Sequence, residues 1–135
     1  MHASAFQEAI EAIVRKDSRF DPSAYLLLKE ALDFTVNRAK EENDGESRHV
    51  SGPELLDGFR EFVLQQFGPM AYTLLREWGI HRCTHIGEMV FLLIGEQVFG
   101  KQDSDTIEDF SDIFTFDEAF IQPFLPEKNP VLPAT

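Results

Sequence analysis

Cysteine is nearly absent from this chain: Cys83 is the only one among 135 residues, so no disulfide can form within it. Basic residues are also scarce, because 12 Lys and Arg stand against 24 Asp and Glu, for a formal net charge of −12. A chain this acidic repels phosphate groups, so we expect neither nucleic acid nor a membrane surface as a partner. The single cysteine and a start without a basic, then apolar leader predict a cytoplasmic protein.

Long hydrophobic runs are missing too. The most apolar segment, residues 84–99, is too short to span a bilayer and contains Glu88 and Glu96. The chain also has no nucleophile elbow, no phosphate-binding loop and no dinucleotide fingerprint. These absences make us lean against an enzyme, and no cofactor is expected.

Residues 51–99 contain the clearest structural signals. Ser51 and Glu54 form a capping box, with Pro53 in the first turn, and predict a helix over 51–67. A shorter helix over 70–78 ends at Gly79. Thr84 is expected to cap a third helix, which runs to residue 99. Its inner face carries Ile86, Met89, Val90, Leu93 and Ile94. Gly87 and Gly95 weaken this helix, so we expect a neighbouring element to pack closely there.

The first half of the chain predicts two more helices. One covers residues 6–16, and the other runs from the start signal Asp21-Pro22 to about residue 40. The polar residues 41–48 read as an exposed loop. The predicted fold is mostly α: a single domain over residues 1–122, built as a compact bundle of about five helices.

The last third of the chain changes character, because acidic residues alternate with phenylalanines. Residues 113–116 can form one short strand or hairpin, and residues 117–121 one helical turn. Since burying a Phe is favourable by roughly 1.5–3 kcal/mol, we expect at least Phe116 and Phe120 to pack on 51–99. The alternative is that this segment docks a partner. Asp109, Asp112 and Asp117 should stay in water. The proline-rich residues 123–135 are expected to be a flexible tail.

Several segments together resemble one protein family: residues 49–60, 67–68, 78–80, 86–91, 109–110 and 116–120. This family consists of short proteins restricted to planctomycete and verrucomicrobial bacteria, and it has no assigned activity. The resemblance covers roughly residues 10–121. It implies a bacterial, cytoplasmic protein and transfers no functional residue.

Two groups of residues have metal-ligand chemistry. His81, Cys83 and His85 alternate ahead of a helix, yet structural zinc needs four ligands and no second cluster exists. Four acidic residues provide oxygen ligands but miss the EF-hand pattern: Asp103, Asp105, Glu108 and Asp109. We therefore expect a polar loop in the first case and a solvated acidic loop in the second.

The prediction for function is a non-enzymatic protein–protein interaction module whose partner is an unidentified protein. Its candidate surface is apolar and acidic and comprises Glu88, Leu92, Glu96, Phe99, Phe110 and Phe114. One alternative is a metal- or carboxylate-dependent hydrolase. Another is a winged-helix-like regulatory domain without DNA binding, because residues 70–99 have helix-turn-helix length. Homo-oligomerisation is left open.

Overall fold

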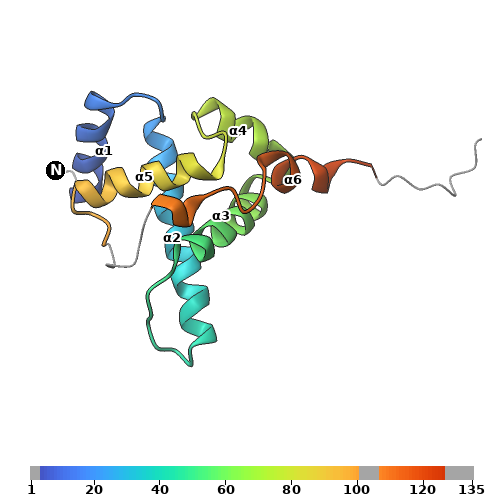
Figure 1. The fold of residues 1–135 in the computed structure, drawn as a ribbon, viewed down its shortest axis with the longest axis horizontal. Coiled ribbons are helices and arrows are strands. Elements are labelled where there is room, and N and C mark those ends of the chain that lie inside the picture. Colours follow the sequence, from blue (N-terminus) through green and yellow to red (C-terminus); the bar gives the residue numbers. More distant parts are fainter. Residues whose placement is uncertain (1–3, 101–106, 127–135) are drawn as a thin grey trace, which may run out of the picture.

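The computed structural model describes residues 4–100 and 107–126, and these form a bundle of helices (Figure 1). The α-helices are α1 (Ala5–Lys16), α2 (Pro22–Glu42), α3 (Gly52–Phe67), α4 (Ala71–Glu77), α5 (Cys83–Gly95) and the one-turn α6 (Phe116–Phe120). Three short 3₁₀ turns accompany them: η1 (Gly68–Met70), η2 (Ile107–Phe110) and η3 (Gln122–Phe124). The predicted mostly α bundle is confirmed. No strand occurs in the described residues, so 113–116 do not take up the optional strand.

The predicted helix starts are largely confirmed. At α3, the Ser51 hydroxyl accepts from the Glu54 amide at 3.3 Å, and the Glu54 carboxylate accepts from the Ser51 amide at 3.0 Å. At α2, the Asp21 side chain accepts from the Ser23 amide at 2.8 Å. The prediction that Thr84 caps α5 is wrong, because this helix already begins at Cys83, after Arg82. A Thr inside the first turn can no longer act as the cap.

The end of α5 also differs from the prediction. The helix stops at Gly95 rather than at residue 99, because Gln97 adopts a left-handed conformation with φ 64°. The Val98 amide then donates to the Leu93 carbonyl at 3.2 Å and the Gln97 amide to the Ile94 carbonyl at 2.9 Å, which is a Schellman motif. Because the chain turns here, Phe99 is free to fold back against α1.

Two glycines allow close approach between elements. A Cβ at Gly58 of α3 would lie 1.9 Å from the hydroxyl oxygen of Thr35 on α2, so the two helices cross nearly in contact there. Gly79 follows α4 with φ 91°, and a Cβ there would lie 2.2 Å from the Arg19 carbonyl oxygen. The sequence predicted that Gly79 ends a helix, but it did not predict that the backbone of Arg19 packs on this glycine.

The core is one cluster that includes the C-terminal segment. Phe116 is 4% exposed and Phe120 is 1% exposed, and α6 contacts both α3 and α4. Their predicted packing on 51–99 is thereby confirmed. Asp112 and Asp117 are exposed as expected, whereas Asp109 is only half-exposed. The reason is that Asp109 lies against Gly52 at the start of α3. Of the predicted flexible tail, residues 127–135 lie outside the described residues.

Tyr25 offers a test of the core on α2. Its side chain is fully buried, and its hydroxyl has no hydrogen-bond partner among the described residues. Burial raises the pKa of this phenol to about 12. Because an unsatisfied buried hydroxyl costs about 1–3 kcal/mol, Tyr25→Phe is expected to raise the free energy of unfolding by about 1 kcal/mol in a denaturant titration.

Tyr72→Phe is the control for this experiment. The Tyr72 hydroxyl is near the surface, where it accepts from Arg76 at 3.3 Å. Its removal is expected to change stability by less than about 0.5 kcal/mol. A loss of stability in Tyr25→Phe would show that the buried hydroxyl is hydrogen-bonded in solution.

Candidate functional site

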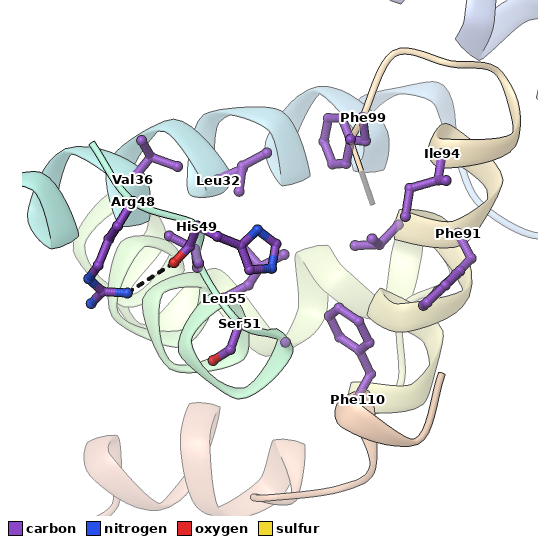
Figure 2. A pocket seen from close by; sticks show the side chains of 14 residues that line it. Leu32, Val36, Arg48, His49, Ser51, Leu55, Phe91, Ile94, Phe99 and Phe110 are labelled. Atoms are coloured by element: carbon purple, nitrogen blue, oxygen red, sulfur yellow. Dashed lines mark hydrogen bonds between the residues drawn. The ribbon is translucent and has the colours of Figure 1, made fainter. Parts of the chain in front are cut away.

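An apolar hollow of about 330 Å³ lies between α2, α3, α5 and η2 (Figure 2). We call it the inter-helix cavity. Its apolar lining consists of Leu32, Val36, Val50, Leu55, Val90, Phe91, Ile94, Phe99 and Phe110. Its polar lining consists of Arg48, His49 and Ser51, and Gly52 and Gly100 complete it. A concave, mainly apolar hollow with few polar groups is typical of binding sites, which usually measure about 300–1,000 Å³.

η2 forms one wall of the cavity because α5 has a glycine where Phe110 packs. A Cβ at Gly87 would lie 2.4 Å from the Cβ of Phe110. The close packing predicted around Gly87 is therefore confirmed, whereas Gly95 has no neighbour within 4 Å. Phe110 is 4% exposed and meets Phe91 edge-to-face, with ring centroids 6.1 Å apart. This wall is a rigid aromatic pair.

Phe99 forms the opposite wall. After the Schellman turn that ends α5, its ring stacks on Phe6 of α1, with centroids 6.0 Å apart. The Lys29 Nζ lies over the Phe6 ring, 5.9 Å from its centroid. The side chain of Phe99 is half-buried, so it shapes the cavity and still reaches the surface.

The polar end of the cavity is formed by the segment that joins α2 to α3. Figure 2 shows the His49 ring pointing into the cavity, whereas the Arg48 side chain is turned toward α3. Arg48 donates to Glu54 twice, from Nη1 to Oε1 at 3.0 Å and from Nη2 to Oε2 at 2.6 Å. This ion pair, with the Ser51 amide, lowers the pKa of the Glu54 carboxyl to about 2. Both partners are therefore charged at any physiological pH.

The predicted interaction residues do not form one surface. Phe99 and Phe110 line the inter-helix cavity, whereas Phe114 packs on Phe116 and Phe120 at the far end of the bundle. On α5, Glu88 accepts from Arg19 at 3.1 Å. Leu92 and Glu96 are half-buried. Only the two cavity residues share a site.

The loop histidines and Cys83 have structural contacts. Cys83 is fully buried, its thiol donates to the Phe114 carbonyl at 3.4 Å, and burial raises its pKa. The His85 Nδ1 accepts from the His81 backbone amide at 3.1 Å. The rings of the two histidines are 5.7 Å apart. A buried thiol of raised pKa is a poor nucleophile and a poor metal ligand.

The acidic loop is described only in part. Asp103 and Asp105 lie outside the described residues, Glu108 is exposed, and Asp109 packs beside Gly52. Within residues 4–100 and 107–126, no three His, Cys, Asp or Glu side chains come together as metal ligands would.

The segment of helix-turn-helix length is α4, the turn at 78–82, and α5. The residues of α5 other than Gly95 are buried or half-buried, because the helix packs against α1, α3 and η2. A helix that reads DNA presents an exposed polar face to the major groove. In the described structure α5 presents no such face.

Sequence reasoning missed most of the cavity. Leu32 and Val36 were visible only as part of the apolar face of α2, and Arg48 as part of a polar loop. No local pattern marks these residues as neighbours of Phe110, because they are brought together only by the packing of α2, α3 and η2. The one usable signal was Gly87, whose predicted close neighbour proved to be this phenylalanine.

None of the described helices combines the length and the apolar character that crossing a membrane requires. Comparison of the whole chain with protein-family models, curated proteins and solved structures finds no match.

Proposed function

We propose that this protein is a non-enzymatic protein-binding module, and that the inter-helix cavity takes one large apolar side chain from a partner protein. The observation that carries this proposal is the lining: nine apolar side chains around about 330 Å³. Protein interfaces are commonly dominated by a single anchor residue buried in such a pocket. Burial of that anchor would supply the binding energy, since it removes apolar surface from water.

The partner is proposed to be a protein in the bacterial cytoplasm. The net charge of −12 disfavours nucleic acid, and the resemblance to a planctomycete and verrucomicrobial family favours a bacterial origin. A second copy of this chain would also qualify as a partner, provided that it presents an apolar side chain to the cavity.

A library of displayed random peptides tests the proposal directly. Peptides selected on the full chain are expected to share one large apolar residue. They should lose binding to Val36→Phe, because this residue lines the cavity and a larger side chain fills it. The readout is the affinity of each enriched peptide, measured by fluorescence polarisation.

Leu26→Phe is the matched control. Leu26 lies on the same helix, is 44% exposed and does not line the cavity. Enriched peptides should bind this variant as they bind wild type. Peptides that bind wild type, Val36→Phe and Leu26→Phe equally would show that the cavity is not the binding site. Sedimentation of the same three proteins reports whether self-association depends on Val36.

A further inference from the structure

Among the described residues, Arg48 is the one that lines the inter-helix cavity and always carries a full charge. A lone arginine beside an apolar cavity would attract carboxylates, because its guanidinium matches them with two parallel hydrogen bonds. Here that position is already filled by Glu54, at 3.0 and 2.6 Å. Arg48 also donates from Nη1 to the His49 carbonyl at 3.0 Å (Figure 2).

A second interaction, besides the ion pair with Arg48, holds the Glu54 carboxylate in place. It belongs to the capping box of α3, where it accepts from the Ser51 amide at 3.0 Å. The helix start therefore positions the carboxylate independently of the arginine. The side chains of Arg48 and Glu54 are 35% and 39% exposed, so the pair is in partial contact with water. Arg48 lines the cavity, and Glu54 reaches it only through this pair.

We infer that Glu54 sets the charge specificity of the inter-helix cavity, because it neutralises Arg48 and so makes the cavity favour an uncharged apolar side chain over an anionic one. This inference rests on the proposed function. An anionic group that enters would lose its hydration and find Arg48, the one permanent cation among the described lining residues, already paired. The net charge of −12 adds repulsion at longer range. The expected anchor is therefore an apolar residue without an adjacent carboxylate.

Two small probes separate charge from shape: N-acetylphenylalaninamide and N-acetylphenylalanine. They share one side chain and differ by a carboxylate. Affinities are measured by ¹H–¹⁵N correlation spectra of the full chain at pH 8. We expect wild type to bind the amide at least about tenfold more tightly than the acid, because only the acid must give up the hydration of a charge.

Glu54→Gln tests the role of the carboxylate. Glutamine keeps the capping box but releases Arg48, so the preference for the amide should fall to about one or reverse. Glu61→Gln is the matched control, because it makes the same change on α3 and removes one of the two carboxylate partners of Arg38, which does not line the cavity. Its amide preference should equal that of wild type. Arg48→Gln, which leaves Glu54 uncompensated, should widen the preference beyond that of wild type.

The outcomes separate this inference from the proposed function. If both probes shift cavity residues such as Val90 and Ile94 but the preference is the same in wild type, Glu54→Gln and Arg48→Gln, the inference is overturned and the binding site stands. If neither probe shifts these residues, both are overturned. If the pair only clamps the loop to α3, Glu54→Gln lowers the melting temperature without changing the preference, which also overturns the inference.

Discussion

Phe120→Ala is expected to lower the free energy of unfolding by about 3–5 kcal/mol, the usual cost of truncating a buried phenylalanine. The side chain is 1% exposed. Its ring lies 5.0 Å from that of Phe116 and 6.2 Å from that of Phe114, measured between centroids. Truncation of Phe120 leaves a cavity on the buried side of α6, which contacts α3 and α4. Urea unfolding followed by circular dichroism measures the loss.

Phe124→Ala is the control for this variant. It removes the same side chain four residues later, where the ring is 43% exposed at the end of η3. The expected loss is below about 1 kcal/mol, as for other surface changes. Equal losses in the two variants, or a small loss in Phe120→Ala, would mean that the C-terminal segment does not contribute to the core in solution.

Gly58→Ala is expected to destabilise the protein by about 3 kcal/mol, near the upper end of the range for overpacking. The new methyl group would lie 1.9 Å from the Thr35 hydroxyl oxygen and 2.8 Å from its Cβ. Thr35 cannot turn away easily, because it is 2% exposed and its hydroxyl donates to the Ala31 carbonyl at 2.7 Å. The helices α2 and α3 must therefore move apart.

Gly95→Ala makes the same chemical change with the opposite expected sign. Nothing lies within 4 Å of a Cβ at Gly95, the last residue of α5, so the variant should gain up to about 0.5 kcal/mol, which is less than the gain in a helix interior. The double variant Gly58→Ala, Thr35→Ala should regain part of the stability lost in the single variant. If Gly58→Ala is as stable as wild type, the two helices do not cross as closely as the structure shows.

The ends of most helices could be predicted from the sequence because their signals are local. A capping box needs only Ser51 and Glu54, and a Schellman motif after α4 needs only Gly79 in the left-handed conformation. The early end of α5 could not be predicted in this way. Gln97 is not a residue that favours φ 64°, so nothing in its type announces the turn. The return of Phe99 to Phe6 accompanies that turn.

The candidate site could be predicted only in fragments. Phe99 and Phe110 were identified as apolar residues in need of a partner, but so was Phe114, which lies elsewhere. The remaining lining comes mainly from α2, the 48–51 segment, α3 and α5, and its residues have ordinary local roles. Which of several apolar faces meet around a cavity depends on where helices cross, and helical spacing does not contain that information.

By itself the sequence determined the mostly α fold, the buried faces, the burial of Phe116 and Phe120, and the acidic charge. These follow from hydrophobic periodicity, capping chemistry and residue counts, which act over a few residues or over the whole chain. Only the tertiary structure decided that Gly58 meets Thr35, that Gly87 receives Phe110, and that Arg48 reaches the cavity already neutralised. Contacts of this kind depend on the crossing of helices distant in sequence, because steric fit and ion pairing are decided within a few ångströms once the helices have packed.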